Sequence, residues 1–63
     1  MRSWQECRVE DVRLGNIISY GGLTDEVVGK RPCSMGGNTS VFLDLRDYGT
    51  LDLYQDLLVE VYR

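Results

Sequence analysis

Hydrophobic and polar residues alternate most regularly in the C-terminal third of the chain. Valine or leucine occupies every odd position of residues 41–46, and leucine occupies the odd positions again in residues 51–54. A period of two is that of a β-strand, whose successive side chains point to opposite faces. Asp47-Tyr48-Gly49 separates the two runs, and glycine readily adopts the positive φ of a tight connection. The pattern therefore predicts a β-hairpin whose odd-numbered residues face a core.

Shorter runs on either side of this hairpin predict further strands. Residues 16–20 and 26–31 are rich in β-branched side chains, which favour strands. Gly29 lies inside the second run and indicates a bulge or a close approach of another part of the chain. Residues 55–58 break the alternation, which predicts a single helical turn, and residues 59–63 resume it as the last strand.

These elements predict an all-β fold, a small five-stranded antiparallel barrel with one short helical turn before the last strand. Closure of a barrel removes the exposed edges of a sheet. A chain of 63 residues forms one domain at most. We expect residues 1–8 to be an N-terminal segment and residues 9–63 to be a single barrel domain.

The inward phase of the strands predicts a hydrophobic core. Neighbouring apolar residues leave the phase open at Ile17 or Ile18 and at Val27 or Val28. The predicted core consists of Val12, Leu14, Ile18, Val28, Val41, Leu43, Leu45, Leu51, Leu53, Val59 and Val61.

Net charge and cysteine content indicate which partners the protein binds and in which cellular compartment it acts. The chain has seven basic and ten acidic residues, a net charge of −3, and its basic residues are scattered. Binding to duplex DNA draws its affinity from phosphate neutralisation, so we expect no duplex binding. No apolar run reaches the length of a membrane span, and we expect no membrane association. Cys7 and Cys33 are expected to be reduced thiols in a cytoplasmic protein, with a disulfide between them as the alternative.

Several short motifs together resemble a known group of proteins. They are Asp-Val-Arg-Leu-Gly-Asn-Ile-Ile, Glu-Val-Val-Gly, Val-Phe-Leu-Asp-Leu, Gly-Thr-Leu-Asp-Leu and Val-Glu-Val. Over Val9 to Arg63 the chain resembles short accessory proteins of actinobacteria and their phages, which have a small Src-homology-3-like barrel. Asn16 stands where their pattern has aspartate. The resemblance implies an architecture and a phage origin, hence action in the host cytoplasm, but no activity.

Residues suited to catalysis or metal binding are sparse. The chain has no histidine, which removes the commonest general base and metal ligand. The cysteines form no Cys-x-x-Cys pair, so we expect no metal site. Cys33, which follows Lys30 and Arg31, is the better placed thiol for a lowered pKa, but no base accompanies it. We therefore expect neither an enzyme nor a bound cofactor.

Aromatic residues carry the main functional hypothesis. Phe42, Tyr54 and Tyr62 fall out of phase with the leucine and valine positions, so they are expected to face outward. Exposed aromatics grouped on one face of a sheet are typical of an interface. With Arg46 they predict a partner-binding surface on a small interaction module, which binds a host or viral protein or assembles with itself as a homo-oligomer.

A second hypothesis is a binder of a small anionic ligand or a nucleic acid, such as a phage protein that sequesters a nucleotide signal. Backbone N–H groups of a glycine-rich loop can bind an anion, and basic residues beside them add attraction. The residues expected to form this site are Lys30, Arg31, Gly36, Gly37 and Asn38.

Overall fold

The protein folds into one antiparallel sheet. This computed structural model describes residues 1–35 and 38–63, and for residues 33–35 and 38 it describes the backbone alone. Six strands and one 3₁₀ turn occur in the described residues. Their bounds are β1 Trp4–Arg8, η1 Val9–Asp11, β2 Ile17–Tyr20, β3 Leu23–Met35, β4 Asn38–Leu45, β5 Gly49–Tyr54 and β6 Leu58–Tyr62. No helix in the described ranges is long and apolar enough to cross a bilayer.

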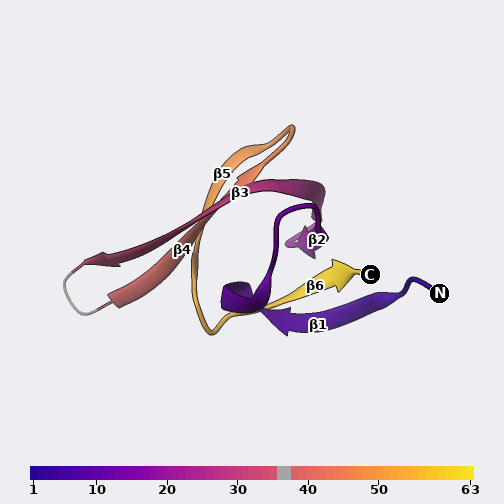
Figure 1. The fold of residues 1–63 in the computed structure, drawn as a ribbon, viewed down its shortest axis with the longest axis horizontal. Coiled ribbons are helices and arrows are strands. Elements are labelled where there is room, and N and C mark those ends of the chain that lie inside the picture. Colours follow the sequence, from indigo (N-terminus) through magenta and orange to yellow (C-terminus); the bar gives the residue numbers. More distant parts are fainter. Residues whose placement is uncertain (36–37) are drawn as a thin grey trace.

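The sheet bends because β3 belongs to both of its halves. The order across the sheet is β1-β6-β2-β3-β4-β5, and all neighbours are antiparallel. The first part of β3 pairs with β2, and the part from Val27 onward pairs with β4 (Figure 1). The second part of β3 forms with β4 an arm that leaves the body of the molecule, whose dimensions are 40 × 22 × 19 Å.

The prediction of five strands in a closed barrel is wrong. Residues 4–8, which the sequence assigns to a separate N-terminal segment, form β1 and pair with β6 from Trp4 opposite Tyr62 to Arg8 opposite Leu58. β1 and β5 lie at opposite ends of the strand order, so the described part of the sheet has two free edges. The all-β, antiparallel part of the prediction is confirmed.

The predicted helical turn before the last strand is instead a β-turn. Leu57 N–H donates to Tyr54 O at 3.1 Å. The carbonyls of Gln55 and Leu57 accept hydrogen bonds from Glu10 N–H (3.1 Å) and Val9 N–H (2.9 Å). The connection between β5 and β6 is therefore held against η1, the 3₁₀ turn that follows β1.

Most of the predicted core is confirmed. Eight of the predicted residues are buried, and Leu51 is half-buried against them. The predictions for Leu14 and Val28 are wrong, since these side chains are 61% and 51% exposed. Val27, the alternative to Val28, is fully buried. The buried apolar residues are Cys7, Val9, Val12, Ile18, Val27, Val41, Leu43, Leu45, Leu53, Val59 and Val61.

The prediction for Leu14 is wrong because the chain turns at η1 and does not keep the period of two that would place Val12 and Leu14 on one face. Val12 N–H donates to Val9 O at 3.1 Å, and this i to i+3 spacing brings both valines to one side of the turn. Leu14 then falls in a tight turn, in which Asn16 Oδ1 accepts a hydrogen bond from Arg13 N–H at 2.8 Å. Its side chain points to solvent.

A bulge in β3 confirms the prediction for Gly29. The pairing of β3 with β4 shifts register between Val27 and Gly29, so Val28 is the extra residue and points outward. A Cβ atom on Gly29 would lie 2.5 Å from Asp44 Oδ2 and 3.0 Å from Asp44 Cβ. Glycine is therefore required here by the close approach of β4.

Candidate functional site

A polar hollow of about 710 Å³ lies beside η1, between β1 and β3. Cys7 and Leu58 contribute to its wall. The remaining lining residues are charged, namely Arg8, Arg13, Lys30, Arg63, Glu6, Glu10 and Asp11. Four of the seven basic residues of the chain therefore converge on one concavity, although they are far apart in the sequence.

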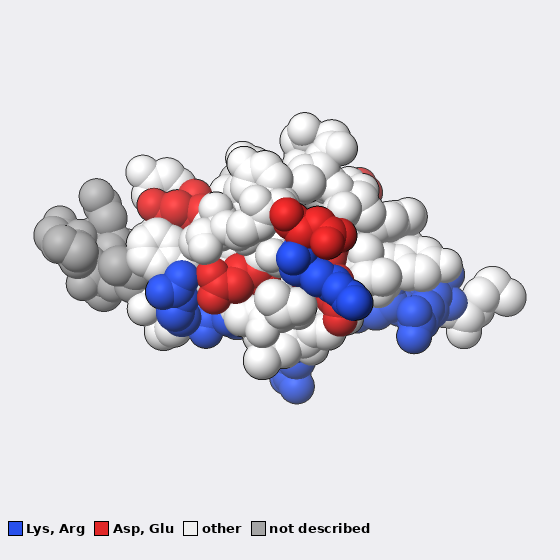
Figure 2. Space-filling view, turned by 90° about the horizontal axis from the view of Figure 1, so that it is seen from above, with Lys and Arg blue, Asp and Glu red and all other residues white. Residues whose placement is uncertain are grey.

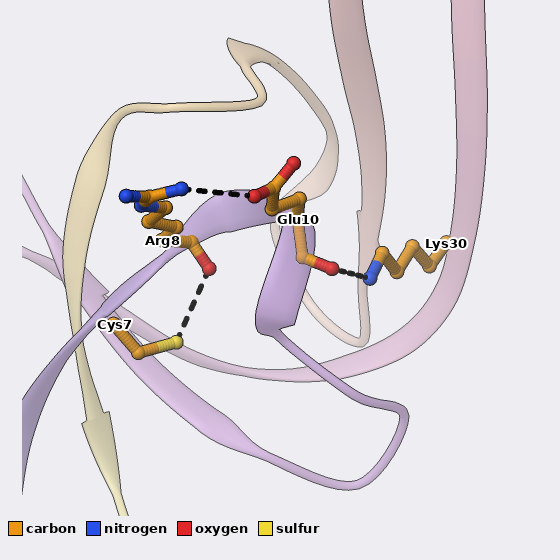
Figure 3. A network of polar contacts seen from close by, with 4 residues as sticks. All are labelled: Cys7, Arg8, Glu10 and Lys30. Atoms are coloured by element: carbon orange, nitrogen blue, oxygen red, sulfur yellow. Dashed lines mark hydrogen bonds and ion pairs between the residues drawn. The ribbon is translucent and has the colours of Figure 1, made fainter.

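Lys30 fastens η1 to β3 at this hollow. The bulge at Val28 reverses the phase of β3, so Lys30 is opposite the buried Leu43 and its side chain is on the core side of the sheet. Its ammonium group donates to the backbone carbonyl of Glu10 (Figure 3) and to that of Val12, the latter at 2.8 Å. These bonds satisfy two carbonyls of η1 and its C-terminal flank.

The thiol of Cys7 lies at the wall of the same hollow. Its Sγ donates to Arg8 O at 3.2 Å, and Arg8 Nη1 lies 3.4 Å from Glu10 Oε1 in an exposed ion pair (Figure 3). Burial raises the pKa of the Cys7 thiol above 9.0, and the positive charge of Arg63 offsets part of that increase. The thiol is free and is protonated at neutral pH, so it is not an activated nucleophile.

A second concave region lies along the free edge of β5. It is a groove of about 460 Å³ lined by Tyr20, Ser40, Asp52, Leu53, Tyr54 and Leu57. Tyr54 is 66% exposed, and Tyr20 is exposed as well. Aromatic and aliphatic side chains and a single carboxylate therefore lie next to the unpaired edge of β5.

The backbone of β5 presents hydrogen-bonding groups along this edge. Gln55 N–H donates to Thr39 O at 3.4 Å, and β5 keeps its register with β4 without a shift. In an antiparallel pair, bonded and non-bonded positions alternate. The N–H and C=O groups of Thr50 and Asp52 and the N–H group of Tyr54 therefore point away from β4 and toward the free edge, while the Tyr54 carbonyl accepts from Leu57 N–H in the turn.

The structure divides the predicted partner-binding residues between different places. Phe42 and Tyr54 are diagonal neighbours on the outer face of β4 and β5, because Phe42 is opposite Asp52. Tyr62 is in the other half of the sheet, where its ring lies 5.2 Å from that of Trp4. Arg46 is in the β4–β5 turn.

Charged groups near these aromatics are already engaged. The Arg31 guanidinium lies 5.7 Å from the centroid of the Phe42 ring and 3.0 Å from Asp44 Oδ1. Arg46 Nη1 lies 3.4 Å from Glu26 Oε1. The hydrogen bond from Thr50 and the charge of Arg31 lower the pKa of Asp44. Phe42 is half-buried under Arg31, so Tyr54 is the more accessible aromatic on this face.

The residues predicted to bind an anion are not brought together. Lys30 lies on the core side of β3, and the adjacent Arg31 lies on the outer side beside Phe42. Gly36 and Gly37 lie outside the described residues, and so does the side chain of Asn38. The side chain of Cys33 is likewise outside the description.

No pattern in the sequence predicts the hollow beside η1, although Lys30 is among the residues expected to bind an anion. The residues next to Arg13 and Arg63 in the sequence do not mark them as site residues. Only the 3₁₀ turn and the pairing of β1 with β6 bring both arginines to the same concavity. No group of three potential metal-ligating side chains occurs among the described residues.

Comparison with known proteins yields no match to a family model, a curated protein or a solved structure.

Proposed function

We propose that the protein is a small, non-enzymatic interaction module that binds an extended segment of a partner protein along β5. The observation that supports this is the free edge of β5, where the N–H groups of Thr50, Asp52 and Tyr54 and the carbonyls of Thr50 and Asp52 point outward beside a groove. An extended peptide added to such an edge gains main-chain hydrogen bonds, and flanking pockets select its side chains.

The side chains of the groove suggest which segment fits. Asp52 forms no ion pair with any described residue, and it lines the groove together with Leu53 and Tyr54. Asp52 and Tyr54 share the outer face of β5, so a basic side chain that neutralises Asp52 and an apolar side chain that covers Tyr54 must lie two residues apart on the bound strand. We therefore infer a partner strand with a basic and an apolar residue at positions i and i+2.

The proposal keeps two parts of the sequence interpretation. The resemblance to phage proteins implies a host or viral protein as the partner. The shared strand β3, which pairs with β2 at one end and β4 at the other, supports an opened form of the Src-homology-3-like arrangement.

A designed peptide provides the direct test. An acetylated strand peptide centred on Val-Thr-Lys-Thr-Val, which puts Lys and both Val side chains on one face, is titrated into ¹⁵N-labelled protein, beside a peptide with Glu in place of Lys. We expect saturable shifts of the Thr50, Asp52 and Tyr54 amides with the Lys peptide, since these amides face the edge. Equal binding of both peptides, or shifts confined to other strands, would contradict the proposal.

Two substitutions separate the groove from general charge effects. Asp52→Lys should reverse the preference toward the Glu peptide. Asp56→Lys makes the same charge change in the exposed turn after β5 and should leave the preference as it is. If the edge amides shift with protein concentration in the absence of peptide, and light scattering shows a dimer, the occupant of the edge is a second copy of the chain.

A further inference from the structure

Three cationic side chains of the hollow beside η1 lack a carboxylate partner. Arg8 is paired with Glu10, but Arg13, Lys30 and Arg63 form no ion pair within 4.0 Å in the part of the chain that the structure describes. On the outer face, by contrast, Arg31 and Arg46 each have an acidic partner. Arg2 is unpaired as well but does not line the hollow, so three of the four unpaired cations among the described residues meet at one concave site.

Lys30 holds the most constrained of these charges. Its side chain is half-buried, and two of its three N–H groups are used by the carbonyls of Glu10 and Val12 (Figure 3). Carbonyl dipoles stabilise the ammonium group but do not neutralise its charge. One donor and one full positive charge remain at the wall of the hollow, where partial burial strengthens electrostatic attraction.

The composition of the lining limits the ligand to a small anion. Four cations face three carboxylates, Glu6, Glu10 and Asp11, so the hollow has a net charge of +1 in a chain whose net charge is −3. A long polyanion would be repelled by the surrounding carboxylates. No aromatic side chain lines the hollow, so it offers no surface on which a nucleobase would stack.

Arginine side chains define the chemistry of the ligand further. A guanidinium group presents a rigid fork of N–H donors that matches two oxygens of a carboxylate or phosphate. A tetrahedral oxyanion has enough oxygens to accept from two arginines and an ammonium group at once. We propose that the hollow binds a phosphate group, with Arg13 and Arg63 as the main donors and Lys30 as the fixed charge.

Titration with two probes tests this site and distinguishes its sources of phosphate. Inorganic phosphate and glycerol 3-phosphate are each added to ¹⁵N-labelled protein at constant ionic strength, with sodium chloride as the balancing salt. We expect saturable shifts of the amides of Cys7, Glu10 and Asp11 with at least one probe. Tighter binding of inorganic phosphate indicates a free ion, and tighter binding of the ester indicates the phosphate group of a larger molecule. Shifts that grow linearly, without saturation, for both probes overturn the proposal.

Charge-matched variants locate the binding. Arg13→Gln and Arg63→Gln should each weaken phosphate binding by about tenfold, the typical effect of one lost charge-assisted hydrogen bond. Arg46→Gln removes the same charge from the outer face and should leave the affinity unchanged. Equal weakening by all three variants would mean non-specific attraction and would refute the site.

Thermal unfolding gives an independent measurement that does not require Lys30 to be removed. Because a ligand that binds the folded state stabilises it, the melting temperature of the wild type should rise with phosphate at constant ionic strength. The two hollow variants should lose this rise while the Arg46→Gln control keeps it. A rise of the same size in all proteins would contradict the proposal. The peptide experiments on β5 address a different edge and different residues, so the two proposals can fail separately.

Discussion

Asp25 illustrates how one buried carboxylate holds a distant turn in place. Its Oδ1 accepts from Glu26 N–H at 2.7 Å, and its Oδ2 accepts from Asp47 N–H at 2.9 Å and Tyr48 N–H at 2.8 Å. Asp25 is 9% exposed, and no other charged residue in the described part of the chain is buried. It clamps the β4–β5 turn to β3, so its role is structural.

These hydrogen bonds make stability depend on pH. The Tyr48 N–H bond is the main cause that lowers the pKa of Asp25 below 3.8, with the Asp47 and Glu26 bonds adding to it and burial opposing it. The unfolded chain therefore takes up the proton at higher pH than the folded chain does. The stabilisation is complete above pH 3.8 and is lost as the pH falls through the folded-state value.

We expect Asp25→Asn to lower the melting temperature at neutral pH and to flatten its decline below the pKa of a free aspartate. An amide cannot accept at all three N–H groups, because its NH₂ group is itself a donor. Melting curves from pH 2 to pH 7, followed by circular dichroism, measure this. Asp52→Asn, at the exposed edge of β5, is the control and should leave the curve unchanged. An Asp25→Asn variant as stable as the wild type would show that the clamp contributes little.

At the scale of the element, the β4–β5 hairpin supplies four of the eleven buried apolar residues in the described part of the chain. Val41, Leu43 and Leu45 are buried, while Phe42 and Asp44 between them face the outer side. β4 also lies between β3 and β5, so it has a paired strand on each side. This agrees with the strict alternation of the sequence in this segment.

Leu43→Ala should destabilise the protein by about 2–5 kcal/mol, because it leaves a cavity at a fully buried position. Leu14→Ala makes the same chemical change at a side chain that is 61% exposed, and we expect an effect of about 0.5 kcal/mol or less. Urea denaturation of the two variants and the wild type measures the difference. Similar losses in both variants would mean that Leu14 packs against the core and that the assignment of η1 is wrong.

At the scale of the whole molecule, basic and acidic side chains lie next to one another on the outer surface. Figure 2 shows lysine and arginine beside aspartate and glutamate on one face, without a continuous basic surface. The ion pairs of Arg31 with Asp44 and of Arg46 with Glu26 account for part of this pattern. Three of the four basic residues without an ion pair in the described part of the chain line the hollow beside η1 instead, and this hollow of about 710 Å³ is too small to hold a duplex.

We therefore expect no non-specific binding to duplex DNA at physiological salt. Few phosphates could be neutralised at once, and counterion release would contribute little affinity. Fluorescence anisotropy with a labelled duplex, repeated at several salt concentrations, measures this. Micromolar binding with a steep dependence on salt would contradict the prediction and indicate a basic surface formed in another way.

The sequence by itself determined the parts of the fold that follow from local alternation. The hairpin of residues 41–54, the outward phase of Tyr54 and the special role of Gly29 are confirmed because period and glycine geometry act between near neighbours. The predicted partner-binding surface of Phe42, Tyr54, Tyr62 and Arg46 stays a prediction, and Phe42 and Tyr62 lie in different halves of the sheet.

Tertiary structure alone decided the remaining features. The bulge at Val28 sends Lys30 inward and Arg31 outward, and its position depends on how β4 packs against β3. The pairing of β1 with β6 joins the two ends of the chain, and no local pattern encodes a partner more than fifty residues away. The hollow beside η1 and the clamp of Asp25 both arise from such long-range contacts, since each unites side chains and backbone groups that meet only after folding.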